Sequence, residues 1–170
     1  MDATHLTGWL LVTGSLAFGA GAGNPYLVRA WTAPQETFLA IVARQPLAWR
    51  LSHYLFIGGT VLTAAGLAGL PGVVPEGWPR GLTLAGTVGF AIAAALWLVS
   101  LLYRLAVAPT TARGFAESGH IEPWIADLDR LSGALFAAFI VIAFAALAAI
   151  GIATTAGGPI PAILCWGTAA

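Results

Sequence analysis

The residues best suited to chemistry are a histidine and two polar neighbours that lie at the ends of apolar segments. His53 and Arg50 are three positions apart, so they share one face if this segment is helical. Tyr103 is the last residue of the next apolar segment along the chain. An imidazole near a guanidinium and a phenol can accept a proton or hydrogen-bond to a quinone or another small ligand. We therefore expect His53, Arg50 and Tyr103 to form the binding site if a cofactor is held.

Four further charged residues are expected on the same side of the membrane as His53, namely Arg104, Asp127, Asp129 and Arg130. One interpretation is structural, because carboxylates near a helix N-terminus are favoured by the helix dipole and can join a ring of ion pairs. The other is functional, because an aspartate beside His53 would set the charge of the imidazole. The sequence leaves both interpretations open.

The three histidines offer little support for haem or zinc. His5 and His53 are expected at opposite faces of the membrane, so they cannot share one iron. His53 with His120 is the pair left for a haem b, and it requires the connection to fold inward. His53, His120 and one aspartate have the right ligand types for zinc but lack a helical i, i+4 pair. The sequence requires no cofactor, and a quinone or a haem b remains an open alternative.

The segments that must position these residues have the composition of a membrane protein. Among 170 residues, 59% are hydrophobic and 8% are charged, whereas soluble domains carry about a quarter charged residues. The net charge of zero excludes a nucleic-acid binder. The single cysteine, Cys165, excludes an internal disulfide. Sequence motifs of common hydrolases and nucleotide-binding enzymes are absent, so we expect no catalytic activity.

Four windows free of charged residues are long enough to cross the hydrocarbon layer as helices, namely 6–23, 51–70, 81–103 and 131–153. We predict one all-α integral membrane domain over 1–170, with four transmembrane helices in a compact bundle. Small residues let membrane helices approach closely. The predicted contact positions are Gly14, Gly19, Gly58, Gly59, Gly86 and Gly89.

The connections between the windows differ in character. In 24–50, Thr32, Pro34 and Gln35 are typical of a helix start, and the apolar residues that follow predict a short amphipathic helix at the membrane surface. Connection 71–80 is rich in proline and glycine and predicts a tight turn. Connection 104–130 is long and holds most of the acids. The apolar tail 154–170 is expected to lie at the interface.

The arginines predict the orientation. All of them except Arg80 fall in the connections 24–50 and 104–130, which the positive-inside rule places in the cytoplasm. Both termini are then outside the cytoplasm, in a multi-pass protein of a bacterial inner (plasma) membrane. Residues 1–5 lack the basic residue of a signal peptide, so we expect the first segment to be a retained helix.

Three functions are consistent with these observations. The favoured hypothesis is a small non-catalytic accessory subunit, whose glycine faces pack against other membrane helices or a second copy. The alternative is a redox or ligand-binding protein that holds a quinone, a haem b or a pigment on the His53 side. A small transporter is the third, although the predicted spans hold few ionisable groups.

Overall fold

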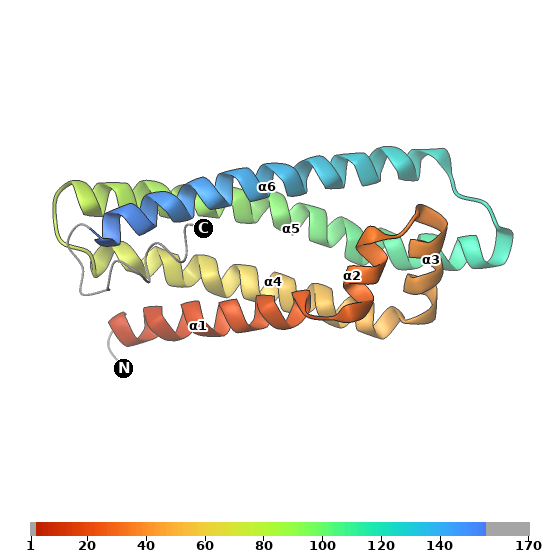
Figure 1. Ribbon diagram of the computed structural model, residues 1–170, viewed down its shortest axis with the longest axis horizontal. Helices are drawn as coiled ribbons and strands as arrows, with labels where there is room; N and C mark the ends of the chain where they lie inside the picture. Colours follow the sequence, from red (N-terminus) through yellow and green to blue (C-terminus); the bar gives the residue numbers. More distant parts are fainter. Residues whose placement is uncertain (1–2, 156–170) are drawn as a thin grey trace.

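A computed structural model describes residues 3–155, and this part of the chain is helical with no strands (Figure 1). The all-α class predicted from the sequence is therefore confirmed. A 3-10 turn, η1 (Leu70–Gly72), follows the fourth helix. The α-helices are α1 (Ala3–Ala22), α2 (Pro25–Thr32), α3 (Gln35–Arg44), α4 (Pro46–Gly69), α5 (Trp78–Ser118) and α6 (Pro123–Thr155).

Three stretches are long and apolar enough to cross a membrane: Pro46–Gly72, Trp78–Ser118 and Pro123–Thr155. Helix α1 meets the same test only together with α2, from which it is bent by 60°. The structure therefore has three candidate spans, or four if this bent pair is one broken span. These helices are compatible with a multi-pass membrane protein.

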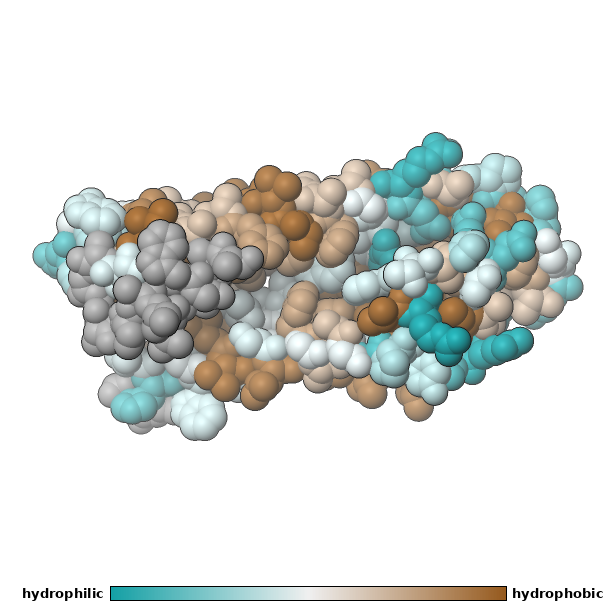
Figure 2. Space-filling model, viewed as in Figure 1, coloured by the Kyte–Doolittle hydropathy of each residue, from teal (hydrophilic) through white to brown (hydrophobic). Residues whose placement is uncertain are grey.

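The long helices pack as two pairs. Helix α1 lies along α4, α5 lies along α6, and the two pairs meet mainly where α4 contacts α5. Figure 2 shows the face between the pairs hollowed, with apolar residues on both sides of the hollow. The compact four-helix bundle expected from the sequence is thus not confirmed, because the contact between the pairs is much less extensive than the contact within each pair.

Glycines explain the close contact within each pair. A Cβ added at Gly14 of α1 would lie 2.6 Å from Thr63 Oγ1, and one added at Gly59 of α4 would lie 2.6 Å from the Phe18 backbone nitrogen. A Cβ at Gly86 of α5 would lie 2.8 Å from the Ala146 carbonyl oxygen. These distances are too short for any side chain, so the helix backbones touch only because glycine is present.

The remaining predicted contact glycines behave differently. A Cβ at Gly89 would lie 3.3 Å from Ala146 Cβ, which is a tight but lesser contact. Gly19 and Gly58 have nothing within 4 Å of an added Cβ among the residues described, so neither packs against another helix of this chain. Both lie on glycine-rich helices. The number of glycines in a helix does not reveal which face of that helix contacts its neighbour.

Two short helices cross the polar end of the molecule, where the sequence predicted one. Helix α2 starts after Asn24, whose side chain accepts from the Tyr26 backbone N–H at 3.1 Å and donates to Ser52 Oγ at 2.7 Å. The predicted short helix is present as α3, but it begins after Pro34, whereas the sequence predicted Thr32 as the cap and Pro34 in the first turn. Thr32 does not cap it, because its hydroxyl donates to the Val28 carbonyl oxygen of α2 at 3.0 Å.

Helix α5 extends far into the expected connection 104–130. Its 41 residues give a length of about 60 Å, roughly twice the hydrocarbon thickness. Pro109 lies inside this helix and is buried beside Ala108 and Ala112, so packing maintains the helix where proline removes a hydrogen bond. The helix ends at Gly119, whose φ of +67° is left-handed and whose N–H donates to the Phe115 carbonyl oxygen at 2.8 Å.

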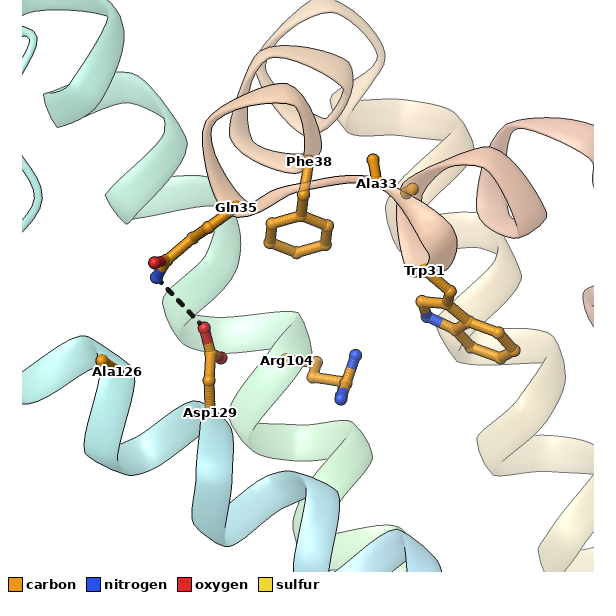
Figure 3. Close-up of a pocket in the computed structure, with 8 residues that line it drawn as sticks. Trp31, Ala33, Gln35, Phe38, Arg104, Ala126 and Asp129 are labelled. Atoms are coloured by element: carbon orange, nitrogen blue, oxygen red, sulfur yellow. Dashed lines mark hydrogen bonds between the residues drawn. The ribbon is translucent and has the colours of Figure 1, made fainter.

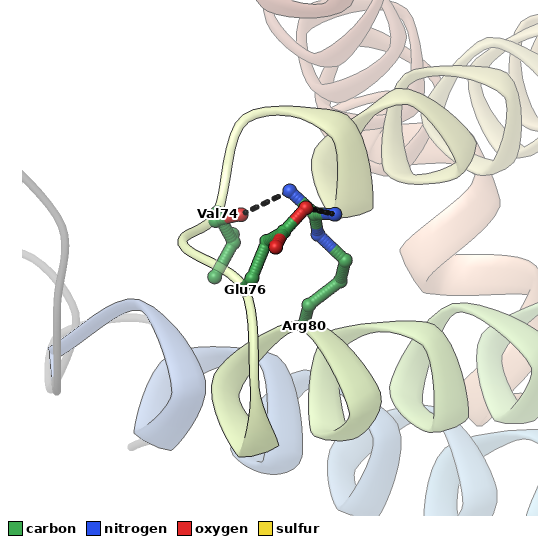
Figure 4. Close-up of polar contacts among 3 residues, drawn as sticks. All are labelled: Val74, Glu76 and Arg80. Atoms are coloured by element: carbon green, nitrogen blue, oxygen red, sulfur yellow. Dashed lines mark hydrogen bonds and ion pairs between the residues drawn. The ribbon is translucent and has the colours of Figure 1, made fainter.

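The opposite end of the molecule is closed by the turn between η1 and α5. Arg80 Nη1 lies 3.0 Å from Glu76 Oε1, and Arg80 Nη2 donates to the Val74 carbonyl oxygen at 3.3 Å (Figure 4). The tight turn predicted for 71–80 thus contains a short 3-10 segment, and α5 begins within it at Trp78. Most of the tail predicted at the interface, including Trp166, lies outside the described residues.

Candidate ligand-binding site

Two adjoining cavities lie where α2 and α3 cross α5 and α6. The first, called here the aromatic cavity, has a volume of about 200 Å³ and is lined by Trp31, Trp97, Arg104 and Phe136. The second, called the polar cavity, has a volume of about 290 Å³ (Figure 3). Its lining consists of Ala30, Trp31, Ala33, Gln35, Phe38, Arg104, Ala126 and Asp129. Because Trp31 and Arg104 line both, the guanidinium lies between an apolar chamber and a polar one.

Arg104 is held by hydroxyl groups along one edge. Its Nε donates to Ser132 Oγ at 3.0 Å, and Ser132 Oγ lies 2.7 Å from Ser100 Oγ. Ser100 also donates to the Ser132 carbonyl oxygen at 3.1 Å, and both serines are buried between α5 and α6. Among residues 3–155, the two terminal amino groups of Arg104 form no hydrogen bond or ion pair. The guanidinium is therefore fixed at Nε and free at its outer edge.

Asp129 is the acidic residue of this site, and its carboxylate is used by two other donors. Tyr103 OH donates to Asp129 Oδ1 at 3.0 Å, and Gln35 Nε2 donates to Asp129 Oδ2 at 3.5 Å (Figure 3). These bonds join α6 to α5 and to α3. No ion pair links Asp129 to Arg104, so the carboxylate leaves the outer edge of the guanidinium available.

Stacked aromatic rings form the apolar wall. Trp97 is stacked on Phe139 with ring centroids 5.3 Å apart and lies 5.0 Å from the Phe136 ring, while Trp31 is stacked on Phe56 at 5.7 Å. Trp97 is 2% exposed, but Trp31 and Phe136 are 39% and 37% exposed. The wall is thus rigid on its inner side and reaches the molecular surface at two of its rings.

His53 faces the interior and lines neither cavity, although it lies within electrostatic reach of Arg104. Its side chain is fully buried, its Nδ1 donates to the Trp49 carbonyl oxygen at 2.8 Å, and its ring packs on Trp49 at 4.1 Å. Its Nε2 has no hydrogen-bond partner in the described part of the chain. Arg50 is exposed, and Tyr103 bonds to Asp129. The structure therefore does not assemble the three residues that the sequence predicted as one binding site.

The predicted polar cluster is divided in two. Arg104 and Asp129 line the polar cavity, whereas Asp127 and Arg130 form an exposed ion pair of 2.9 Å on the other side of α6. Sequence reasoning did not identify Trp31, Gln35, Ser100, Ser132 and Phe136. The signal for the serines is that each is a hydroxyl within an apolar segment near the level of Arg104, where a buried hydroxyl needs a partner.

Residues 3–155 contain no cluster of three or more histidine, cysteine or acidic side chains placed to hold a metal ion. The donors at the site are instead a guanidinium, hydroxyls and an amide, which suit an anion or a hydrogen-bond acceptor. No protein-family model, curated protein or solved structure matches the chain.

Proposed function

We propose that this protein binds a small amphiphilic molecule, with the anionic head of the ligand on Arg104 and its apolar body in the aromatic cavity. The observation that carries the proposal is the free outer edge of the Arg104 guanidinium between the two cavities. Arginine stays protonated in proteins, so this edge presents a positive charge and two amino groups to any molecule that enters.

The position of Arg104 explains why a ligand is expected. Arg104 interacts with the Asp129 carboxylate electrostatically but forms no direct ion pair with it, so part of its desolvation cost is left uncompensated, and such residues commonly mark binding sites. Ser132 supplies a neutral hydrogen bond to Nε but no negative charge. A carboxylate or phosphate group would provide both the missing charge and a planar or tetrahedral set of acceptors for the two amino groups.

The glycine faces give the accessory-subunit hypothesis only limited support. Gly14, Gly59 and Gly86 are used in contacts within the chain, whereas Gly19 and Gly58 have open space around them. If the ligand is a quinone, we expect it at Arg104 and not at His53, because a quinone carbonyl oxygen can accept a hydrogen bond from the guanidinium. A quinone lacks the negative charge that would compensate the arginine, so an anion fits the site better.

The proposal is tested with 2-naphthoate, which combines a carboxylate with a flat apolar body. We expect the purified protein to bind this probe, measured by titration calorimetry or by quenching of tryptophan fluorescence. Arg104→Gln should weaken binding by about 10- to 100-fold, since a charge-assisted hydrogen bond contributes about 1.5–3 kcal/mol. Arg104→Lys should bind with intermediate affinity, because it keeps the charge but loses the planar pair of amino groups.

The matched control is Arg130→Gln, which removes an exposed arginine near the same end of the molecule. It should bind the probe like the parent protein. Equal affinities of Arg104→Gln and Arg130→Gln, in preparations that both retain the helical content of the parent, would refute the proposed function.

A further inference from the structure

We infer that the natural ligand is an anionic membrane lipid, whose acyl chain enters the aromatic cavity sideways from the bilayer. This inference rests on the proposed function, because it assumes that the head group binds Arg104. It adds the chemical class of the apolar body and the route of entry. Three observations support it, namely the opening, the size and the depth of the cavity.

The opening lies on the side of the molecule that faces lipid if the long helices cross the membrane. Phe136 of α6 and Trp31 of α2 line the aromatic cavity and are both more than a third exposed. Trp31 comes from the crossing helix α2 and Phe136 from the α5–α6 pair. The surface between the two long-helix pairs is hollowed (Figure 2). Among the described residues, the lining of the aromatic cavity apart from Arg104 consists of aromatic rings, so an acyl chain can pass from the hydrocarbon layer into it along an almost entirely apolar surface.

The size of the aromatic cavity favours a ligand that is only partly enclosed. Pockets that enclose a drug-sized molecule have volumes of about 300–1,000 Å³. The aromatic cavity, at about 200 Å³, is smaller than that range. A long apolar body must therefore continue beyond the opening, where the surrounding lipid would solvate it. An acyl chain meets this requirement because it is flexible and is soluble in the hydrocarbon layer.

The depth of Arg104 matches that of a lipid head group. Arg104 directly follows the charge-free segment 81–103, so it marks the edge of the hydrocarbon layer. The polar cavity begins at the same level and contains Gln35 and Asp129. A lipid with its head group at the interface would place its negative charge at Arg104 and its first methylene groups beside Trp97 and Phe136.

The experiment uses palmitate that carries a diazirine in the middle of its chain. The full-length protein is reconstituted in phosphatidylcholine vesicles with a small fraction of this probe, illuminated and digested, and the labelled peptides are identified by mass spectrometry. We expect labelling to concentrate on the parts of α5 and α6 around Trp97 and Phe136. Unlabelled palmitate should compete for this labelling in the parent protein, which tests the site without any variant.

Two pairs of variants sharpen the result. Arg104→Gln should reduce labelling of these segments by about 10-fold or more, and Arg130→Gln should leave it unchanged. Phe136→Trp narrows the opening and should also reduce labelling several-fold. Phe144→Trp is its matched control, because Phe144 is exposed on the same helix and lines neither cavity.

Several outcomes would overturn the inference. Uniform labelling of the lipid-facing surface that is insensitive to Arg104→Gln and to unlabelled palmitate would contradict it. If 2-naphthoate binds in an Arg104-dependent manner while palmitate does not label the cavity, the proposed function stands and the acyl lipid is wrong. If labelling disappears as the protein density in the vesicles rises, a second copy of the chain covers the opening. If neither probe depends on Arg104, both the proposed function and this inference fail.

Discussion

At the scale of single residues, the site depends on one set of side chains that positions Arg104 and on another that hydrogen-bonds to the carboxylate of Asp129. Ser132 fixes Nε of the guanidinium, and Tyr103 and Gln35 engage the carboxylate of Asp129. A carboxylate with two hydrogen-bond donors has less to gain from swinging toward the arginine. The outer edge of the Arg104 guanidinium is thus free because Ser132 binds its Nε and because Tyr103 and Gln35 bind the Asp129 carboxylate.

Tyr103→Phe tests this network, because it removes one donor to Asp129 and no ring atoms. We expect a loss of about 1 kcal/mol in the free energy of unfolding, the usual contribution of a hydrogen bond. We also expect weaker 2-naphthoate binding, by less than in Arg104→Gln, as Asp129 turns toward Arg104 and competes with the probe. Thermal unfolding in detergent and probe titration measure the two effects.

Tyr54→Phe is the control, because Tyr54 of α4 is exposed and its hydroxyl forms no hydrogen bond within residues 3–155. It should match the parent protein in both measurements. Unchanged probe affinity in Tyr103→Phe would show that the Tyr103 bond does not position Asp129.

Which residues belong to the site was only partly predictable. The sequence shows the level of Arg104 and Asp129 in the membrane, because both stand beside charge-free segments. It does not show which way each side chain points around its helix. His53 and Asp127 were predicted on the same side of the membrane as Arg104 and Asp129, but His53 packs on Trp49 and Asp127 faces outward. No spacing or motif in the sequence connects Trp31 with Phe136, because the two residues come together only when α2 packs near α6.

At the scale of helices, the packing of α1 against α4 depends on backbone contact at particular glycines. Gly14 and Gly59 lie at that contact, whereas Gly19 lies on the same helix as Gly14 with open space around it. The sequence indicated that glycines would mediate close packing, and this is correct for Gly14, Gly59 and Gly86. It could not separate them from Gly19 and Gly58, because the contacting face depends on the rotation of each helix about its axis.

The pair Gly14→Leu and Gly19→Leu tests this difference on one helix. A leucine at position 14 would collide with Thr63 and should destabilise the protein by about 1–3 kcal/mol or prevent α1 from docking. A leucine at position 19 meets no neighbour and should leave stability within about 0.5 kcal/mol of the parent. The midpoint of thermal unfolding in a mild detergent measures both. Equal stability of the two variants would show that α1 is rotated or does not pack as described.

Two helices departed from the expected boundaries for physical reasons. Helix α5 continues through Pro109, where buried neighbours compensate for the lost hydrogen bond, and stops at Gly119, where the backbone is left-handed. Helix α1 is followed by a bend of 60° into α2, because Asn24 and Pro25 start a new helix. Proline thus stands at a helix start at Pro25 and inside a helix at Pro109, and only tertiary packing distinguishes the two.

At the scale of the whole molecule, the arrangement of two helix pairs creates the site. Helices α2 and α3 lie across the polar end and contribute Trp31, Gln35 and Phe38 to the cavities, while α5 and α6 contribute Arg104 and Asp129. The polar residues gather at this end of the molecule (Figure 2). Composition predicted a membrane protein, and the positions of the arginines along the sequence predicted that most of them lie at one end. The limited contact between the pairs, and hence the cavity, follows from packing geometry that composition does not describe.

The central claim is that Arg104 holds an anionic amphiphile, and the most direct test is to identify what co-purifies with the protein. The parent protein, Arg104→Gln and Arg130→Gln are extracted from the same host membranes in mild detergent, and their bound small molecules are quantified by mass spectrometry. We predict that the parent and Arg130→Gln retain the same acidic amphiphile in stoichiometric amount, and that Arg104→Gln lacks it. Equal retention of that molecule by Arg104→Gln, or no enrichment of any acidic amphiphile on the parent protein, would contradict the claim.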